Sequence, residues 1–249
     1  MTGHILVERH GAVQVARMNR PDKKNALTRA MYAKMAAALV AGDADPGIRV
    51  HVFLGVPGAF SAGNDLADFL AVANGGEGGG EVWDFLVALA KAEKPVLSGV
   101  DGIAVGIGMT LNLHCDLTFA TPRTVFRTPF VDLGLVPEAG SSLLAPQILG
   151  RQDAFALLAL GEGFSAERAK AAGLIHAVVG ESELEAAVLA AAERIAARPP
   201  EALKIARDLM RGPREPLLAR IAEESELFRR RLKSDEAMAA LAAFMERKR

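Results

Sequence analysis

Residues 95–142 have the sequence PVLSGVDGIAVGIGMTLNLHCDLTFATPRTVFRTPFVDLGLVPEAGSS. The stretch begins with a short apolar run, 95–100, that Asp101-Gly102 ends, which is the pattern of a buried β-strand. Gly106-Ile107-Gly108 then opens a second apolar run. Glycines at a strand-to-helix junction allow a tight turn and a close approach of a ligand to the backbone. We therefore expect the first amides of the following helix to be available to an anion.

Farther along the same stretch, one carboxylate stands among apolar residues. Glu138 follows Leu135, Val136 and Pro137 and precedes Ala139. A partly desolvated carboxylate beside backbone amide donors predicts a site that stabilises an enolate and moves a proton. A glutamate after proline in a loop is, however, more often a solvated or helix-capping group, so these residues alone leave both interpretations open.

Outward from this stretch, strands and helices alternate. Residues 5–7 and 13–15 predict an opening β-hairpin, and Thr28 is placed to cap a helix. The apolar alternation at 50–54 predicts a buried strand, and the glycines of 55–64 predict a loop. Alternation from about residue 50 to 126 indicates an α/β fold with a parallel sheet and helical crossovers. From residue 151 onward the pattern is almost wholly helical.

The pattern divides the chain into an α/β core, 1–197, and a helical C-terminal region, 198–249. Pro199-Pro200 and Gly212-Pro213 separate the C-terminal helices. The apolar faces of the last helices exceed what the edge of one small domain covers, so we expect a symmetric oligomer. These faces consist of Leu217, Leu218, Ile221, Phe228, Leu241 and Phe244.

The amino-acid composition of the chain argues against several classes of function. The chain has 249 residues and a formal net charge of -1, which gives no case for nucleic acid or an anionic membrane as partner. No run is apolar enough for a bilayer span, and the first residues do not resemble a signal peptide. The single cysteine, Cys115, excludes a disulfide within the chain. We expect a cytoplasmic protein.

Five short sequence motifs occur along the chain in an order that is typical of one protein family. They are NRP with NAL (19–21 and 25–27), FSAGNDL (60–66), DGIAVG (101–106), TPF to LG with PEAGSS (128–142), and SAE to AAGLI (165–175). Together they resemble the enoyl-CoA hydratase/isomerase (crotonase) superfamily over nearly the whole chain. Within it, three strings are most similar to the peroxisomal-type Δ3,Δ2-enoyl-CoA isomerases: GNDL (63–66) with Phe69, TPF running to LG (128–134), and PEAGSS (137–142).

The resemblance implies a crotonase-like spiral of ββα repeats, with a helical C-terminal region used for trimerisation. It implies a homo-trimer or a dimer of trimers, and an acyl-CoA thioester as substrate. Coenzyme A is then part of the substrate, and no separate cofactor is expected. Matched residue by residue, the thioester oxygen would lie between the backbone amides of Ala62 and Ile107.

The resemblance also distinguishes two possible reactions, hydration and movement of a double bond. Hydratases of the family use two glutamates, and this chain has Thr110 and Phe130 at those positions. Neither side chain serves as a base at neutral pH, whereas Glu138 alone suffices to move a double bond. An enoyl-CoA isomerase with Glu138 as proton shuttle is therefore the leading hypothesis. Hydratase or another crotonase-type activity is the alternative, and a CoA-ester binding protein without turnover is the third.

The resemblance further assigns residues to CoA binding. Lys23, Lys24, Ala26 and Leu27 would line the pantetheine and adenine end, and Phe244 and Lys248 would reach the nucleotide of a neighbouring subunit. Asp65 and Leu66 complete the expected binding set. Asp65 is also a candidate base, as is Asp132, although an aspartate in a Gly-Asn-Asp-Leu turn more often bonds the loop backbone.

His114-Cys115-Asp116 superficially suggests a metal site. Three consecutive residues at a helix end point in different directions, and the remaining histidines share no ligand spacing. We therefore expect no metal.

Overall fold

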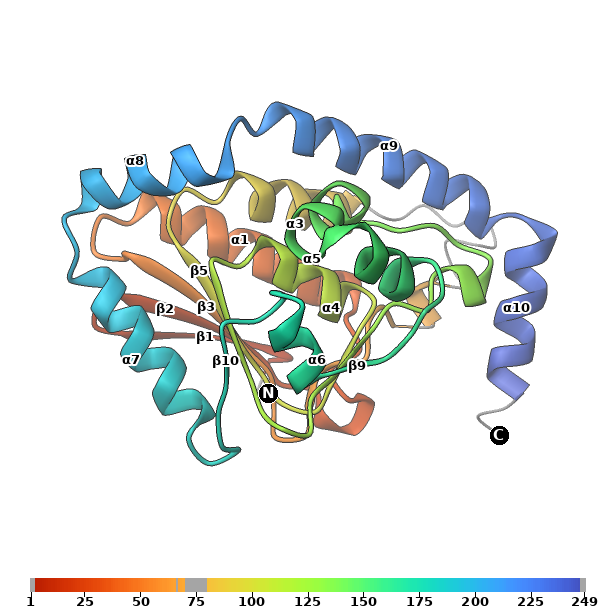
Figure 1. Cartoon of the computed structure of the whole chain (residues 1–249), viewed down its shortest axis with the longest axis horizontal. Helices are drawn as coiled ribbons and strands as arrows, with labels where there is room; N and C mark the ends of the chain where they lie inside the picture. Colours follow the sequence, from red (N-terminus) through yellow and green to blue (C-terminus); the bar gives the residue numbers. More distant parts are fainter. Residues whose placement is uncertain (1–2, 66, 70–79, 247–249) are drawn as a thin grey trace.

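The structure, a computed structural model, describes residues 3–65, 67–69 and 80–246, apart from the side chains of Phe244 and Met245. Its larger sheet has the order β1-β2-β3-β5-β7-β10. The strands are β1 (Ile5–His10), β2 (Val13–Met18), β3 (Val50–Leu54), β5 (Val96–Val100), β7 (Leu117–Ala120) and β10 (Ala177–Val178). The hairpin β1–β2 is antiparallel, as predicted, and every other neighbouring pair is parallel (Figure 1).

A smaller sheet has the order β4-β6-β8-β9. Its strands are β4 (Ala59–Ser61), β6 (Ile103–Val105), β8 (Val125–Arg127) and β9 (Phe164–Ser165). Consecutive strands from β3 to β8 alternate between the two sheets, so each turn of the chain adds one strand to each. This is the expected spiral of ββα repeats. The predicted loop 55–64 is wrong in part, because it contains β4.

Helices close each turn of the spiral. They are α1 (Arg29–Ala44), α3 (Gly80–Lys91), α4 (Ile107–Thr110), α5 (Ser141–Leu158), α6 (Ala166–Ala171) and α7 (Leu184–Ala196). Short 3-10 helices lie at η1 (Pro21–Lys23), η2 (Leu111–His114) and η3 (Val131–Leu133). The predicted cap is present, because the Thr28 side chain accepts a hydrogen bond from the Met31 amide at the start of α1.

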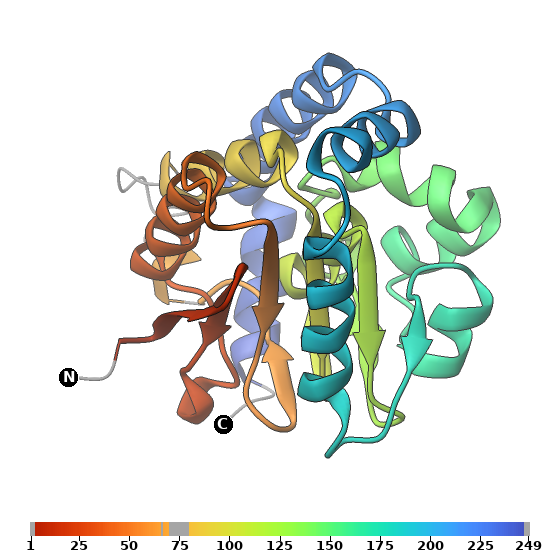
Figure 2. The ribbon, with the colours of Figure 1, turned by 90° about the vertical axis from the view of Figure 1, so that its left-hand side faces the viewer.

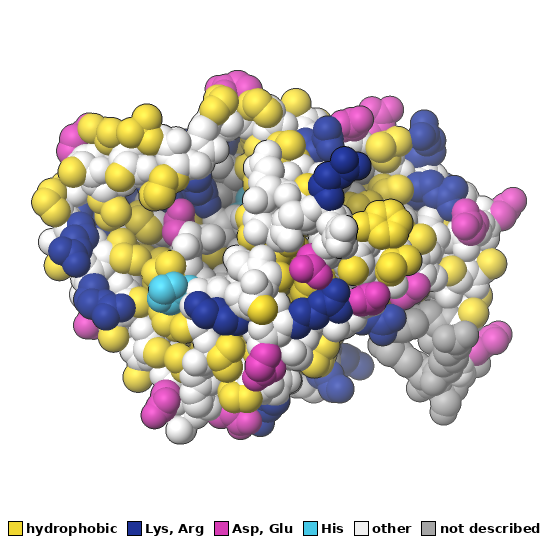
Figure 3. All heavy atoms as spheres, viewed as in Figure 1, with side chains coloured by type: hydrophobic (Ala, Val, Ile, Leu, Met, Phe, Trp, Pro, Cys, Tyr) yellow, Lys and Arg dark blue, Asp and Glu magenta, His cyan; other side chains and the backbone are white. Residues whose placement is uncertain are grey.

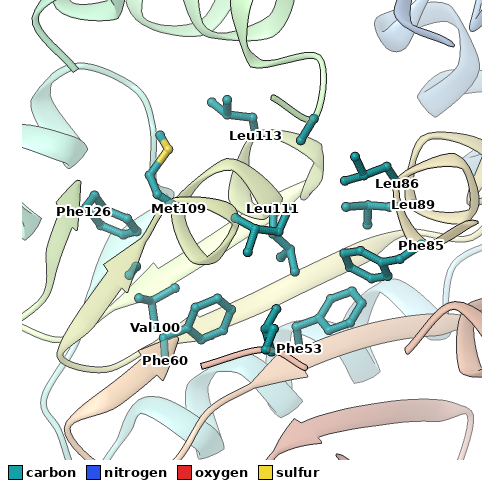
Figure 4. Close-up of a cluster of buried hydrophobic side chains, with 14 of the residues drawn as sticks. Phe53, Phe60, Phe85, Leu86, Leu89, Val100, Met109, Leu111, Leu113 and Phe126 are labelled. Atoms are coloured by element: carbon teal, nitrogen blue, oxygen red, sulfur yellow. The ribbon is translucent and has the colours of Figure 1, made fainter. Parts of the chain in front are cut away.

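The central strands β3 and β5 of the larger sheet are buried at every residue, which explains their nearly continuous apolar sequences. Along β3, Val52 and Leu54 pack toward α7, whereas Phe53 between them packs toward α1 and α3. Figure 2 shows α7 lying across one face of this sheet. On the other face, Phe53 meets Phe85 of α3 edge-on, with ring centroids 6.2 Å apart. Figure 4 shows this cluster, which fixes α3 and α4 over the strands.

Three helices end the described chain: α8 (Pro200–Arg211), α9 (Glu215–Leu232) and α10 (Asp235–Glu246). In Figure 1, α8 and α9 cross the top of the molecule and α10 descends at its side. Ile221 and Leu241, expected on an oligomer face, are buried within this chain instead. That argument for an oligomer is therefore wrong at these two residues. The division between 197 and 198 stays a prediction, and it falls between the ends of α7 and α8.

Exposed apolar side chains gather elsewhere, on α8. Ile205, Leu209 and Met210 are exposed, the last two by 79% and 82%. Figure 3 shows hydrophobic side chains on the surface at the upper left, where α8 lies. Arg207 of α8 is buried and pairs with Asp116 at 2.9 Å, which anchors the helix to the core. The oligomer stays a prediction. Each helix in the described part of the chain is too short or too polar to cross a membrane.

Candidate active site

A cavity of about 580 Å³ lies between α1, α3 and α9. Its volume is in the range of small-molecule binding sites. Most of its wall is apolar and comes from residues that are far apart in the sequence: Leu27, Phe69, Val82, Trp83, Leu86, Phe228 and Leu232. Glu138 is on the wall of this cavity. The cavity therefore combines an apolar lining with the carboxylate that the sequence singled out.

Glu138 is almost completely buried, with 8% of its surface exposed. The hydroxyl of Thr110 donates a hydrogen bond to its Oε1 at 2.5 Å. Burial raises the pKa of Glu138 to about 8, the Thr110 hydrogen bond works against that rise, and the charge of Glu224 adds to it. The carboxyl therefore takes up and releases a proton near neutral pH, which suits a general base.

The segment that carries Glu138 is held in an unusual conformation. Ala139 has φ +61° and Gly140 has φ +71°, so two successive residues are left-handed before α5 begins. The Ala139 carbonyl accepts a hydrogen bond from His114 Nε2 at 2.7 Å. Burial lowers the pKa of His114 to about 4, so its ring is neutral at working pH. His114 is thus a fixed hydrogen-bond donor that supports the loop.

A second buried carboxylate, which the sequence did not reveal, supports the same segment from α9. Glu224 accepts hydrogen bonds from the Gly140 amide at 2.5 Å and from the Ser142 amide at 2.9 Å. The Ser142 hydroxyl also donates to it, at 2.5 Å. No pattern in the sequence could have found Glu224, because its partners lie more than 80 residues away.

Two glycine turns bring backbone amides together beside the cavity. Strands β4 and β6 pair in parallel, so the chain leaves both at the same edge of the sheet. A Cβ on Gly106 would lie 4.0 Å from Gly63 Cα, which shows how closely the turns approach. The Ile107 amide is the first of α4 and has no acceptor among the described residues.

The expectation for Ala62 needs correction. Its N–H donates to the Lys24 carbonyl at 2.9 Å and is therefore engaged within the protein. The N–H of Asn64, two residues on, has no acceptor in the described chain, because the bridge to Leu27 uses the flanking groups of Gly63 and Asp65. The amide available at the first turn is thus that of Asn64.

The side chain of Asn64 is also fixed. Tyr32, fully buried on α1, donates its hydroxyl to Asn64 Oδ1 at 2.5 Å, and both residues line the cavity. Burial raises the pKa of Tyr32 well above its usual value, with a smaller contribution from the Glu138 charge. Tyr32 therefore remains a donor at any working pH. The influence of Glu138 on it places the two side chains in one electrostatic environment.

The residues expected to bind CoA lie partly beside this site. Lys23 and Lys24 are exposed at η1, and Lys24 has a left-handed conformation with φ 49°. Ala26 accepts a hydrogen bond from Arg20 through its carbonyl, and Leu27 is buried on the cavity wall. The predictions for Leu66, Lys248 and the Phe244 side chain lie outside what the structure describes.

The buried side chain of Asn25 ties this N-terminal loop to the first glycine turn. Its Nδ2 donates to the carbonyls of Ala59 and Phe60, and its Oδ1 accepts from the Arg20 amide. The Ser61 hydroxyl in turn donates to the Asn25 carbonyl at 2.8 Å. The two loops are therefore one hydrogen-bonded unit.

Neither alternative base has the surroundings of Glu138. Asp65 lines the cavity, but it pairs with Arg20 at 2.6 Å. Burial favours a higher pKa for Asp65, yet the hydrogen bonds from Arg20 and the backbone amides of Ala67 and Asp68 outweigh it and lower the pKa. Asp132 is half exposed and pairs with Arg127 at 3.0 Å, away from the cavity wall.

His114, Cys115 and Asp116 do not converge. His114 binds the Ala139 carbonyl, Cys115 donates to the Leu111 carbonyl, and Asp116 pairs with Arg207. Within the described residues, no three His, Cys, Asp or Glu side chains are arranged to hold a metal ion.

The chain matches the family described as Enoyl-CoA hydratase/isomerase over residues 8–249. It is 35% identical over 250 residues to Enoyl-CoA delta isomerase 2 of Rattus norvegicus, covering 98% of this chain and 64% of that protein's length. It is 30% identical over 250 residues to the 2,3-dehydroadipyl-CoA hydratase of Escherichia coli (strain K12), covering 98% and 96%. The solved structure of Pseudomonas aeruginosa OdaA, 44% identical, superposes with a TM-score of 0.93 over 98% of this chain and 99% of that one. This chain therefore belongs to the enoyl-CoA hydratase/isomerase family.

Proposed function

We propose that this protein is a Δ3,Δ2-enoyl-CoA isomerase that moves a β,γ double bond into the α,β position. The observation that carries the proposal is the pairing of Thr110 with Glu138. Thr110 occupies the position at which the resemblance places one hydratase glutamate, and it donates its hydroxyl to the remaining carboxylate at 2.5 Å. Phe130, at the other such position, is buried and apolar. Neither of these two positions thus supplies a proton-transferring carboxyl, and Glu138 is the buried carboxyl on the cavity wall.

The reaction follows from this arrangement. The Glu138 carboxylate removes a proton from C2, and the electron pair of the C2–H bond passes into the thioester carbonyl to form an enolate. The enolate electrons then return: the carbonyl reforms, a C2=C3 bond forms, and the former C3=C4 pair takes the proton from Glu138 at C4. Substrate and product contain the same atoms, so a single carboxyl serves as base and then as acid.

The enolate oxygen requires donors that are already in place. We assign this role to the backbone amides of Asn64 and Ile107, which lie at adjacent turns and have no other acceptor among the described residues. Fixed donors of this kind stabilise developing charge without reorganisation, and losing one costs about a hundredfold to a thousandfold in rate. The acyl chain would occupy the apolar cavity beside Glu138.

A second candidate is hydration of a 2-enoyl-CoA, because a relative of similar identity carries a hydratase name. Incubation of the protein with 3-enoyl-CoA and 2-enoyl-CoA in parallel, with products resolved by mass and retention time, separates the candidates. We expect 3-enoyl-CoA to give an isomer of unchanged mass. Gain of one water from 2-enoyl-CoA at a comparable rate would favour the hydratase, and tight binding of both esters without turnover would favour a binding protein.

A further inference from the structure

The contacts of Glu224 join the C-terminal helices to the segment that carries the proposed base. Glu224 is 4% exposed, and each of its two carboxylate oxygens is used: Oε2 accepts from the Gly140 amide, and Oε1 accepts from the amide and hydroxyl of Ser142. The same Ser142 hydroxyl accepts a hydrogen bond from Arg220 at 3.0 Å. A buried carboxylate bound in this way is held firmly, because hydrogen bonds to charged groups are the strong ones.

The contacts of Glu224 take the place of an N-cap side chain, which helix α5 lacks. The N-cap residue of α5 is Gly140, which has no side chain to bind the free amides of the first turn. Glu224 satisfies two of those amides from a different helix, and its negative charge suits the positive end of α5. Glu138 lies only two residues before this cap. A change in the position of Glu224 therefore moves the backbone that sets the direction of Glu138.

Charge connects the two residues as well. The Thr110 hydroxyl donates a hydrogen bond to Glu138, the charge of Glu224 raises the pKa of Glu138, and the charge of Glu138 raises the pKa of the Tyr32 phenol. Burial raises the pKa of Glu224, and its three donors and the nearby Arg220 oppose that rise. The other charged groups on the cavity wall are Arg29, Asp65, Asp68, Glu226 and Arg229.

We propose that Glu224 is a positioning residue of the active site, which fixes the segment bearing Glu138 to α9 and holds a negative charge beside it. The proposal rests on the proposed isomerase function. Helix α9 also supplies Ala222, Ser225 and Phe228 to the cavity wall, on both sides of Glu224 in the sequence. Occupation of the cavity by an acyl chain is thereby coupled to the placement of the base.

Two variants test the charge of Glu224 and the length of its side chain. Glu224→Gln keeps the length of the side chain but removes the charge and one of the two acceptor oxygens, so its effect on charge is measured through the pKa of Glu138. Glu224→Asp keeps the charge and both acceptors but shortens the side chain. Glu215→Gln is the matched control, because it removes the same charge from an exposed position at the start of α9. The pKa of Glu138 is measured in each protein by NMR of glutamate labelled at the side-chain carboxyl carbon, with the resonance assigned through Glu138→Gln.

We expect Glu224→Gln to lower the pKa of Glu138, because the neighbouring negative charge is gone, and to shift the acid limb of kcat toward lower pH. Glu224→Asp should leave that pKa raised while kcat falls by about tenfold to a hundredfold with little change in KM, since small misplacements of a catalytic group cost rates of this order. Glu215→Gln should match the wild type in each measurement.

An unchanged pKa of Glu138 in a folded Glu224→Gln protein would overturn the proposal and leave Glu224 as a helix cap only. Wild-type kcat in Glu224→Asp would overturn the positioning role. If Glu224→Gln does not fold, Ser142→Ala removes a single hydrogen bond from Glu224, and an unchanged kcat in that variant would count against the proposal. The NMR measurement needs no turnover, so a shifted pKa in an enzyme without isomerase activity would refute the proposed function alone.

Discussion

Replacing Glu138 by glutamine tests the burial of this carboxyl through protein stability. The pKa of Glu138 is raised from an ordinary value of 4.5 to about 8, chiefly by burial. Folding therefore favours the protonated form. The stability that this preference provides is fully present below pH 4.5 and is lost as the pH rises through 8. Glutamine has the same shape without a titrating proton, so Glu138→Gln should not show this loss.

The magnitude follows from the shift. Each pKa unit corresponds to about 1.4 kcal/mol, so a shift of this size sets a ceiling of about 5 kcal/mol on the difference between the two proteins. The steepest slope for one proton is about 1.4 kcal/mol per pH unit. Because Glu138 and Glu224 interact, the difference reports the titration of the pair. The stability of the variant relative to the wild type should rise from pH 5 to about pH 8 and level off by pH 9.

Urea unfolding of both proteins at each pH unit from 5 to 9 provides the measurement, at one protein concentration because any oligomer contributes to stability. Groups common to both proteins cancel in the difference between their free energies of unfolding. A difference that stays constant across this range would show that Glu138 is not desolvated in the folded protein. A difference that changes in the opposite direction would show that its pKa is depressed, and the assignment of Glu138 as base would fail with it.

The same Glu138→Gln variant should bind CoA esters as the wild type does, yet lose isomerisation and the exchange of the C2 proton with deuterium; turnover within tenfold of wild type would exclude Glu138 as the base. Thr110→Val removes the hydrogen bond that lowers the Glu138 pKa, so the acid limb of the pH profile should move to higher pH, and an unmoved limb would contradict the contact. Light scattering at micromolar concentration should give a multiple of the 26.3 kDa chain mass. The double variant Leu209→Glu/Met210→Glu should lower the measured mass, because we expect these exposed apolar side chains on α8 to be covered in the oligomer. A wild-type protein of monomeric mass would contradict this expectation.

Local patterns predicted much of the fold. The Thr28 cap, the opening hairpin and the parallel order of the buried strands all follow from sequence periodicity and from turn chemistry. Strand β4 was missed because three residues, Ala59–Ser61, are too few to show an alternation, and its pairing with β6 depends on a segment more than 40 residues away.

The candidate site, like the fold, could be predicted from the sequence only in part. Glu138 stood out because apolar neighbours surround it in the sequence. The resemblance to the family assigns the amide of Ala62 to the first turn. In the structure that amide donates to the carbonyl of Lys24, which with Asn25 adopts a left-handed conformation that the sequence does not predict. Glu224 is a contact between distant helices, and such contacts leave no local signal.

The alternation of strands between the two sheets has a consequence for how this scaffold diversifies. The turns that present the Asn64 and Ile107 amides follow β4 and β6, which are neighbours in one sheet. Paired strands lie about 4.8 Å apart, so the approach of the two turns depends on the pairing of β4 with β6 and not on the length of chain that joins them. Substitutions of cavity-wall residues such as Phe69 and Val82, which lie between β4 and β6 in the sequence, therefore leave the two turns in register. Under the proposed function, substrate preference and enolate stabilisation are thus free to evolve, or to be engineered, independently of one another.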